Sequence, residues 1–449
     1  VCFTMLTYKV SPSSVYGNAF IPSSKSHTLR AILWASVAEG KSTIYNYLDS
    51  PDTEAMICAC KQMGASIKKF PQILEIVGNP LAIFPKYTLI DAGNSGIVLR
   101  FMTALACVFS KEITVTGSSQ LQRRPMAPLL QALRNFGASF HFSSDKSVLP
   151  FTMSGPLRSA YSDVEGSDSQ FASALAVACS LAEGPCSFTI IEPKERPWFD
   201  LSLWWLEKLH LPYSCSDTTY SFPGSSHPQG FSYHVTGDFS SAAFIAAAAL
   251  LSKSLQPIRL RNLDILDIQG DKIFFSLMQN LGASIQYDNE EILVFPSSFS
   301  GGSIDMDGCI DALPILTVLC CFADSPSHLY NARSSKDKES DRILAITEEL
   351  QKMGACIQPT HDGLLVNPSP LYGAVLDSHD DHRIAMALTI AALYASGDSR
   401  IHNTACVRKT FPNFVQTLNI MEARIEECHD NYSMWSTHKR KVFARESFG

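Results

Sequence analysis

The chain has 449 residues, of which 46% are apolar and 18% are charged, a composition that is normal for a globular enzyme. It is too long for a single hydrophobic core, so we expect two or more domains. A formal net charge of −7 argues against nucleic acid as a partner. No apolar run is long enough to span a bilayer and no signal peptide is evident, so we expect a cytoplasmic protein without membrane contact.

The cysteine pattern argues against two kinds of site. Most of the 13 cysteines lie within apolar segments, as Cys107, Cys179, Cys320 and Cys321 do, where free thiols act as small hydrophobes. This usage suits a reducing compartment. The chain has neither a C-x-x-C pair nor an H-E-x-x-H motif, so a zinc or redox site has little support.

A repeat runs along the chain after an alternating segment over residues 1–10, which predicts a strand. Polar residues introduce Ala-rich apolar segments at starts near residues 26, 95, 169, 240, 311 and 381. The spacing of roughly 70 residues indicates internal repetition, and the copies divide naturally as three and three. An apolar segment of helical length without a polar face must be buried, so each copy predicts one buried helix.

A second pattern alternates with the first. Leu-rich amphipathic segments end on Gly-Ala and continue into β-branched or aromatic residues at Gly64, Gly137, Gly282 and Gly354, with degenerate copies at 209–211 and 420–422. Glycine is a favourable C-cap residue for a helix, and the β-branched and aromatic residues beyond it favour a strand. Each unit is therefore predicted to combine strands with one amphipathic and one buried helix.

Two segments lack this periodicity. Residues 213–233 are rich in Ser, Thr, Pro and Gly, and we interpret them as a loop just before the fourth copy, where the chain is expected to cross between domains. From residue 431 onward the chain is polar and basic, which predicts a tail over 431–449.

Cationic side chains recur near the predicted helix starts, where unpaired N–H groups and the helix dipole favour anions. They are Lys25, Arg30, Arg100, Arg124, Lys338, Arg342, Arg383 and Lys409. Cations in such positions imply an anionic ligand. Because the whole chain is acidic, this ligand should be a small molecule with several negative charges. Phosphate and carboxylate groups fit, since Arg binds either through two parallel hydrogen bonds.

Short motifs follow one another in a fixed order from about Ser11 to Glu427. They are Ser24-Lys25-Ser26 with Arg30, Gly93-Asn94-Ser95-Gly96 with Arg100, Arg124-Pro125, Ser169-Gln170, Lys338-Glu339-Ser340-Asp341-Arg342, Asp381-His382-Arg383 and Lys409-Thr410-Phe411-Pro412. Each motif alone is weak, whereas the ordered set is highly specific. Together they resemble the 5-enolpyruvylshikimate-3-phosphate (EPSP) synthase family of enolpyruvyl transferases.

The resemblance implies an α/β fold of two domains, each with three βαβαββ repeats whose buried helices lie inside surrounding sheets. Domain 1 would comprise residues 1–20 and 237–430, domain 2 residues 21–236, and ligand would bind between them. It also implies transfer of the enolpyruvyl group of phosphoenolpyruvate to the 5-hydroxyl of shikimate 3-phosphate through a tetrahedral adduct, with loss of phosphate. This is the sixth step of the shikimate pathway to chorismate and the aromatic amino acids. We expect a monomer with neither metal nor organic cofactor.

The resemblance also implies roles for single residues. Shikimate 3-phosphate would contact Lys25, Ser26, Arg30, Ser169, Gln170, Asp311 and Lys338. Phosphoenolpyruvate would contact Lys25, Gly96, Arg100, Arg124, Gln170, Arg342, Arg383 and Lys409. Asp311 would take the hydroxyl proton, and Glu339 with Lys25 would move the proton to and from the enolpyruvyl carbon. We assign no role to His382, since a buried histidine at a helix start is more often a cap or a packing residue.

Some positions depart from the family pattern. Ile97 stands where Thr is common, Asp168 stands where many members have a phosphate-binding Ser, and Glu195 and Trp198 replace a Ser and a Tyr. A carboxylate at position 168 would repel the acceptor phosphate, so we expect Arg196 to compensate for it. These changes leave open the sensitivity to analogues such as glyphosate.

Two alternatives remain. The related transferase that moves the enolpyruvyl group onto UDP-N-acetylglucosamine has the same repeats and the same donor. Its first motif would carry Lys-Asn where this chain has Lys25-Ser26, and it would have a Cys in the loop that here holds Arg123-Arg124-Pro125. The second alternative is a non-catalytic, anion-binding relative, which would have no need of carboxylates among its cations.

Overall fold

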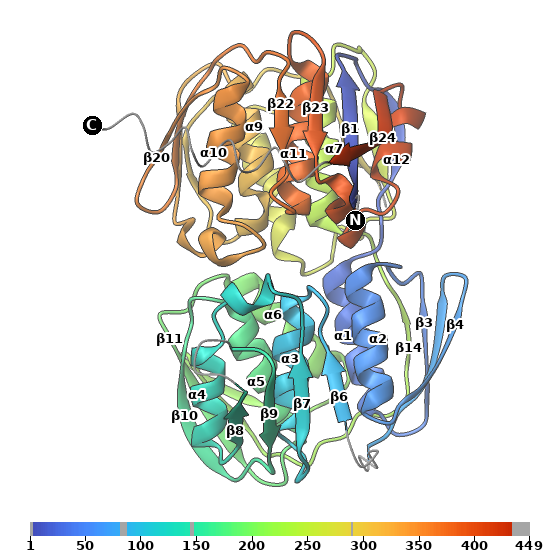
Figure 1. Ribbon diagram of the computed structural model, residues 1–449, viewed down its shortest axis with the longest axis vertical. Helices are drawn as coiled ribbons and strands as arrows, with labels where there is room; N and C mark the ends of the chain where they lie inside the picture. Colours follow the sequence, from blue (N-terminus) through green and yellow to red (C-terminus); the bar gives the residue numbers. More distant parts are fainter. Residues whose placement is uncertain (1–2, 81–87, 144–147, 289–290, 433–449) are drawn as a thin grey trace.

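A computed structural model describes residues 3–80, 88–143, 148–288 and 291–432 of the chain, which form two lobes stacked along the long axis (Figure 1). Each lobe has its own hydrophobic core. One core is drawn from residues 8–21 together with 239–425, and the other from residues 29–235. We call the first the upper lobe and the second the lower lobe, after their places in Figure 1.

Apolar helices lie at the centre of each lobe. They are α1 Lys25–Val37, α3 Gly96–Ala106 and α5 Ser169–Leu181 in the lower lobe, and α7 Phe239–Leu251, α9 Leu313–Phe322 and α11 His382–Tyr394 in the upper lobe. In α7 every residue from Phe239 to Leu250 is buried, as an apolar segment without a polar face requires. These helices begin where the first repeat predicts, which confirms that prediction.

Amphipathic helices form the second set. They are α2 Pro51–Gln62, α4 Ala127–Asn135, α6 Arg196–Lys208, α8 Ile273–Asn280, α10 Arg342–Lys352 and α12 Phe414–Ile420. The residue that ends each of these segments has a positive φ: between 90° and 101° at Gly64, Gly137, Gly282 and Gly354, 55° at His210 and 73° at Glu422. The degenerate copies therefore keep the backbone turn of the glycine copies, although a side chain makes that conformation strained.

The described strands form six four-stranded sheets of one topology, in which a parallel pair is extended by two antiparallel strands. The lower-lobe sheets are β14-β3-β5-β4, β6-β7-β9-β8 and β10-β11-β13-β12. Their strands are β3 Lys41–Tyr45, β4 Ser66–Phe70, β5 Ile73–Val77, β6 Thr88–Asp91, β7 Ile113–Thr116, β8 Ser139–Phe142, β9 Phe151–Ser154, β10 Ala160–Glu165, β11 Cys186–Ile191, β12 Ser214–Ser216, β13 Thr219–Phe222 and β14 Ser232–His234.

The upper-lobe sheets are β16-β17-β15-β2, β18-β19-β21-β20 and β22-β23-β1-β24. Their strands are β1 Phe3–Ser11, β2 Gly17–Phe20, β15 Ile258–Arg261, β16 Ile285–Asp288, β17 Glu291–Val294, β18 Ser303–Asp305, β19 Ser327–Tyr330, β20 Cys356–Pro359, β21 Leu364–Asn367, β22 Val375–Asp377, β23 Ser399–His402 and β24 Arg424–Tyr432. The first strand of the chain thus completes the sheet of the last repeat. In the lower lobe, β14 pairs in parallel with β3 and forms the edge of the first repeat's sheet.

Two sequence predictions need correction here. The polar segment 213–233 contains the hairpin β12–β13 and the strand β14, because Tyr220 and Phe222 point into the core while their polar neighbours face outward. Strand β24 extends through Tyr432, so Asn431 and Tyr432 pair with β1 instead of starting a tail. Residues 433–449 lie outside the described residues.

The chain passes between the lobes in two segments that lie side by side. The backbone N–H of Ser24 donates to the carbonyl of Thr236 over 2.8 Å, and the N–H of Asp238 donates to the carbonyl of Pro22 over 2.8 Å. None of the described helices combines the length and the apolar composition that a membrane span needs.

Candidate active site

A cavity of about 80 Å³ lies between the two lobes, with space for only a few water molecules. Its walls are Lys25, Ser26, Arg30, Asp52, Gly96, Ile97, Arg124, Ser169, Gln170, Glu195 and Trp198 from the lower lobe, and Asp238, Ser240, Ile310, Asp311, Lys338, Glu339, Arg342, His382, Arg383 and Lys409 from the upper lobe. The buried helices of both lobes therefore direct their N-termini at one space, which is a favourable place for anions.

Polar caps fix these helix starts. The Oγ atoms of Ser24 and Ser95 accept hydrogen bonds from the first turns of α1 and α3, and the carboxylates of Asp168, Asp238 and Asp381 do the same for α5, α7 and α11. The caps hold the first residues of each helix at the cavity. Lys25, the first residue of α1, is placed there in this way and lies 3.6 Å from the carboxylate of Asp52.

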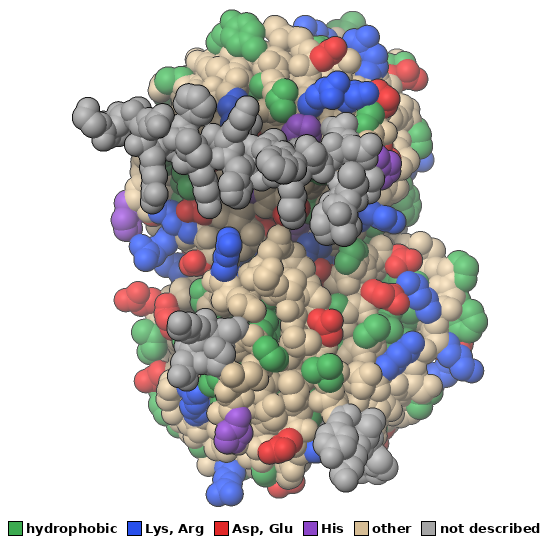
Figure 2. All heavy atoms as spheres, in the orientation of Figure 1, with side chains coloured by type: hydrophobic (Ala, Val, Ile, Leu, Met, Phe, Trp, Pro, Cys, Tyr) green, Lys and Arg blue, Asp and Glu red, His purple; other side chains and the backbone are tan. Residues whose placement is uncertain are grey.

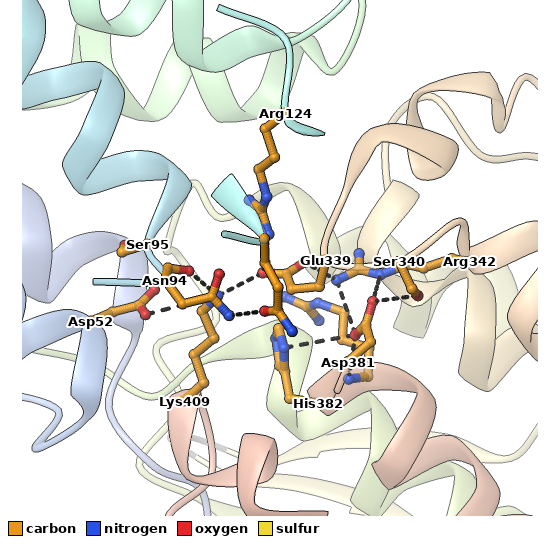
Figure 3. A network of polar contacts seen from close by, with 12 residues as sticks. Asp52, Asn94, Ser95, Arg124, Glu339, Ser340, Arg342, Asp381, His382 and Lys409 are labelled. Carbon is orange, nitrogen blue, oxygen red and sulfur yellow. Dashed lines mark hydrogen bonds and ion pairs between the residues drawn. The ribbon is translucent and has the colours of Figure 1, made fainter. Parts of the chain in front are cut away.

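Three cations converge on the carboxylate of Glu339, which is buried in the loop before α10 (Figure 3). Arg124 lies 2.9 Å from it, Lys409 lies 2.9 Å from it and Arg342 lies 2.8 Å from it. Burial alone would raise the pKa of Glu339, but Arg124, Lys409 and Arg342 together hold it well below its usual value. Without ligand, Glu339 is therefore ionised.

Asp311 is the second carboxylate among the cations. It lies in the single turn Ile310–Ala312 before α9, 2.7 Å from Arg342 and 2.8 Å from Arg383. Burial opposes ionisation, but the two guanidinium groups hold the pKa of Asp311 well below its usual value. Arg342 thus bridges Asp311 and Glu339, and its Nε also donates to Asp381 over 2.8 Å.

A third carboxylate belongs to Glu195, at the other side of the cavity. Lys338 donates to it over 2.6 Å, and the Oγ of Ser169 donates to it over 3.2 Å. Nearby, the guanidinium of Arg30 donates to Ser202 over 2.9 Å and to the carbonyl of Trp198 over 3.3 Å. Apart from Arg30, the cations that line the cavity are thus paired with carboxylates of the protein itself.

The structure brings nearly all the predicted site residues to one cavity. Those that line it are Lys25, Ser26, Arg30, Gly96, Arg124, Ser169, Gln170, Asp311, Lys338, Glu339, Arg342, Arg383 and Lys409. Arg100 is not among the lining residues. It lies behind the wall, where its Nη1 donates to Gln170 over 2.8 Å and lies 3.0 Å from Asp168.

The prediction that Arg196 compensates for the charge of Asp168 is wrong. Asp168 caps α5 and pairs with Arg100, whereas Arg196 lies 2.6 Å from Asp200 on its own helix, with 43% of its side chain exposed. The reason is geometric. Arg196 starts the amphipathic helix α6, whose polar face points outward, while Arg100 lies on a buried helix packed against α5.

Sequence reasoning missed Asp52, Asp238 and His382, which line the same cavity. Asp238 is the N-cap of α7, whereas Asp52 lies in the first turn of α2 after the cap Ser50, so a place at a helix start was the signal for them. His382 is 1% exposed, and among the described residues neither of its ring nitrogens has a hydrogen-bond partner. Burial, with the charges of Lys25, Arg383 and Lys409, holds the pKa of His382 well below its usual value, so the imidazole is neutral.

Within the described residues, two clusters could offer three ligand atoms to a metal ion, and one borders the cavity. Its Glu339, Asp381 and His382 place their ligand atoms within 4.8 Å of one another. Arg342 pairs with both carboxylates, and Arg124 and Lys409 also pair with Glu339. The positive surroundings therefore disfavour a metal cation there.

Comparisons with known proteins agree with this arrangement. The family model described as EPSP synthase (3-phosphoshikimate 1-carboxyvinyltransferase) matches residues 10–418. The chain is 66% identical over 434 residues to the 3-phosphoshikimate 1-carboxyvinyltransferase of Chlamydia caviae, covering 96% of this chain and 97% of that protein. It is 64% identical over 444 residues to that of Chlamydia felis, covering 99% and 100%.

Solved structures give the same result. An EPSP synthase of Acinetobacter baumannii superposes with a TM-score of 0.80 at 26% identity, covering 94% of this chain and 100% of that one. The enolpyruvyl transferase NikO of Streptomyces tendae has a TM-score of 0.77 at 15% identity, covering 95% and 100%, which shows a common fold. The predicted α/β enolpyruvyl transferase fold is confirmed. The chain belongs to the EPSP synthase (3-phosphoshikimate 1-carboxyvinyltransferase) family of transferases.

Proposed function

We propose that the protein transfers the enolpyruvyl group of phosphoenolpyruvate to the 5-hydroxyl of shikimate 3-phosphate and releases phosphate. One observation supports this above the others: Arg342 holds the carboxylates of Asp311 and Glu339 together inside a cavity of cations from both lobes. Such a set of cations can attract two anionic substrates, and it places two proton-transfer groups beside them.

Phosphoenolpyruvate is assigned to the side of the cavity where Arg124, Lys409 and Arg342 converge. The phosphate and carboxylate of this donor are anions that a guanidinium binds with two parallel hydrogen bonds. As they bind, they take over cations that Glu339 holds in the free protein. The pKa of Glu339 then rises, because its compensating charges are shared with the substrate.

Glu339 is assigned the proton transfer at the methylene carbon of the enolpyruvyl group. Protonation of that carbon makes the adjacent carbon electrophilic, so that the acceptor hydroxyl can add to it. The tetrahedral adduct then loses a proton and phosphate. Lys25 is assigned to assist, since burial lowers the pKa of its ammonium group, although Asp52 opposes that shift.

Asp311 is assigned the removal of the proton from the acceptor hydroxyl. It is a carboxylate held by Arg342 and Arg383 over 2.7 and 2.8 Å. Those two cations make it a weak base in the free protein, and it gains basicity when the donor anions draw their hydrogen bonds away. The acceptor is assigned to the region of Ser169, Gln170, Arg30 and Lys338, which also border the cavity.

The test is phosphate release from phosphoenolpyruvate with either shikimate 3-phosphate or UDP-N-acetylglucosamine as acceptor. We expect release only with shikimate 3-phosphate, and a loss of about 100-fold or more in kcat for Asp311→Asn and Glu339→Gln. Glu348→Gln, which removes an exposed carboxylate from α10, is the matched control and should keep full activity. Release only with the nucleotide sugar would refute the proposal, and release with neither would indicate a non-catalytic relative.

We also propose that the protein acts as a monomer in the cytoplasm. Both lobes of a single chain complete the cavity, so the site needs no second subunit. The cysteines among the described residues are free thiols, as a reducing compartment requires. Figure 2 shows acidic and basic side chains interspersed on the described part of one face, without the continuous basic surface of a nucleic-acid binder. Light scattering should give the mass of one chain, and a dimer mass would contradict the proposal.

A further inference from the structure

The carboxylate of Glu195 occupies two hydrogen-bond donors that the proposed function assigns to the acceptor. Lys338 donates to its Oε1 over 2.6 Å, and Ser169 donates to its Oε2 over 3.2 Å. Glu195 is 2% exposed and lines the same cavity. An ammonium and a hydroxyl converging on one anion are the contacts that a phosphate group would make. Glu195 therefore stands in for an anionic group of the ligand.

The backbone holds Glu195 in this place from both lobes. It precedes α6 in a left-handed conformation, with φ of 51°, which a residue with a side chain adopts only when its surroundings require it. Its backbone N–H donates to Asp307 of the upper lobe over 3.3 Å. The side chain meanwhile joins Ser169 of the lower lobe to Lys338 of the upper lobe. Both the backbone and the side chain of Glu195 thus hold it at the interface between the lobes.

The charges around Glu195 determine whether Glu195 or Asp168 can gain a proton. Asp168 lies on the neighbouring helix start and is held 3.0 Å from Arg100. Arg100 and Lys338 keep the pKa of Asp168 below its usual value despite burial, so Asp168 stays ionised. Burial raises the pKa of Glu195, Lys338 opposes that shift, and the negative charge of Asp168 adds to it. Asp307 adds a further carboxylate on the upper-lobe side.

We propose that Glu195 is an internal competitor for the phosphate of the acceptor: its carboxylate holds Lys338 and Ser169 until that phosphate replaces it, and Glu195 then takes up one proton from solvent. This inference rests on the proposed function, because it assumes a phosphate-bearing acceptor at Lys338. A phosphate dianion and an ionised Glu195 at Lys338 would repel each other strongly, and the ionised Asp168 nearby adds to the negative charge. Neutralising Glu195 removes that repulsion, and its acid proton can then donate a hydrogen bond to the phosphate.

The experiment is titration calorimetry of shikimate 3-phosphate on the whole protein between about pH 7 and about pH 9, where the phosphate is a dianion. For the wild type, uptake of one proton makes Kd rise with pH by up to about tenfold per pH unit. Glu195→Gln should bind at least about tenfold more tightly at the upper end of this range, with a Kd that does not depend on pH. Shikimate, which lacks the phosphate, should bind equally to both proteins.

A matched control removes the same charge without the contact. Glu192→Gln changes an exposed carboxylate of the same loop, which does not line the cavity, and it should behave as the wild type does. A second measurement does not depend on any variant. Calorimetry of the wild type in two buffers of different ionisation enthalpy should show about one proton taken up per acceptor bound.

Several outcomes would overturn the inference. They are an equal Kd and an equal pH dependence for the wild type and Glu195→Gln, weaker binding by the variant, or no proton uptake by the wild type. Phosphate release is measured in the same preparations. A wild type that turns over shikimate 3-phosphate yet gives one of these outcomes keeps the proposed function and loses this inference, whereas a wild type that neither binds nor turns it over loses both.

Discussion

The ammonium group of Lys409 lies 2.9 Å from the carboxylate of Glu339, and it also donates to the carbonyl oxygen of Asn94 over 2.9 Å (Figure 3). Lys409 and Glu339 belong to the upper lobe, whereas Asn94 precedes α3 in the lower lobe. One cation therefore both neutralises Glu339 and joins the two lobes at the cavity. Closure of the cavity and the charge state of Glu339 depend on the same side chain.

Lys409→Met should lower kcat/KM for phosphoenolpyruvate by about 10- to 100-fold, the range expected for a lost hydrogen bond to a charged group. Because the loss of a cation raises the pKa of Glu339, which donates the proton, the basic limb of the pH profile of kcat should move to higher pH. Steady-state kinetics across pH measures both effects. Lys253→Met, an exposed change in the same lobe, is the control. An unchanged basic limb would show that Lys409 does not act on Glu339.

Arg100→Met should lower the stability of the fold and release Gln170 from its position, because Arg100 lies behind the cavity wall. The change leaves the buried carboxylate of Asp168 unpaired, at a cost of about 3–5 kcal/mol in the free energy of unfolding. It also frees Gln170, so the KM values should rise. The double variant Arg100→Met with Asp168→Asn keeps a capping residue without the charge and should recover part of the stability. Urea unfolding tests this, and no recovery would contradict the assignment.

Gly96→Ala should weaken donor binding by displacing Arg124. A Cβ atom at Gly96 would lie 2.5 Å from Nη1 of Arg124, closer than real contacts allow. We expect the KM for phosphoenolpyruvate to rise by about tenfold or more, with the Kd of the acceptor nearly unchanged. Gly184→Ala is the control, since its Cβ would meet only Ser159, at 3.5 Å. Equal kinetics for the two variants would argue against Arg124 as a donor ligand.

Asp267→Asn should destabilise the connection between the lobes. Asp267 lies 3.1 Å from the buried ring of His27, and although burial opposes it, hydrogen bonds from His27, Thr236 and Gln269 lower the pKa of Asp267 to about 2. Its pKa in the unfolded chain is about 3.9, so the contact stabilises the fold by roughly 2–3 kcal/mol above that pH. The contribution is lost as the pH falls toward about 2.

Urea unfolding at about pH 7 should therefore show the loss for Asp267→Asn, and the difference from the wild type should shrink between about pH 4 and about pH 2. Asp398→Asn, on the exposed surface of the upper lobe, should not change the free energy of unfolding. A difference that stays constant down to low pH would mean that Asp267 acts through packing and not through its charge.

Local patterns determined much of this protein before any contact was known. The segment Phe239–Leu250 has no polar face, so it had to be buried, and its recurrence at a constant spacing predicted the other buried helices. Glycines such as Gly137 marked helix ends, because a positive φ is easy only for glycine. Cations at the helix starts, such as Lys25, predicted an anionic ligand, because a cation at a helix N-terminus is unfavourable without a compensating anion.

Tertiary structure alone decided which of these groups meet. The motif with Gly96 and Arg100 places both at one helix start, but the sequence does not state that Gly96 faces the cavity while Arg100 faces Asp168. Likewise, Glu195 lies far from Lys338 along the chain, and only the packing of two lobes brings the pair within 2.6 Å. The physical reason is that periodicity shows which face of a helix is buried, whereas its partners are set by long-range packing.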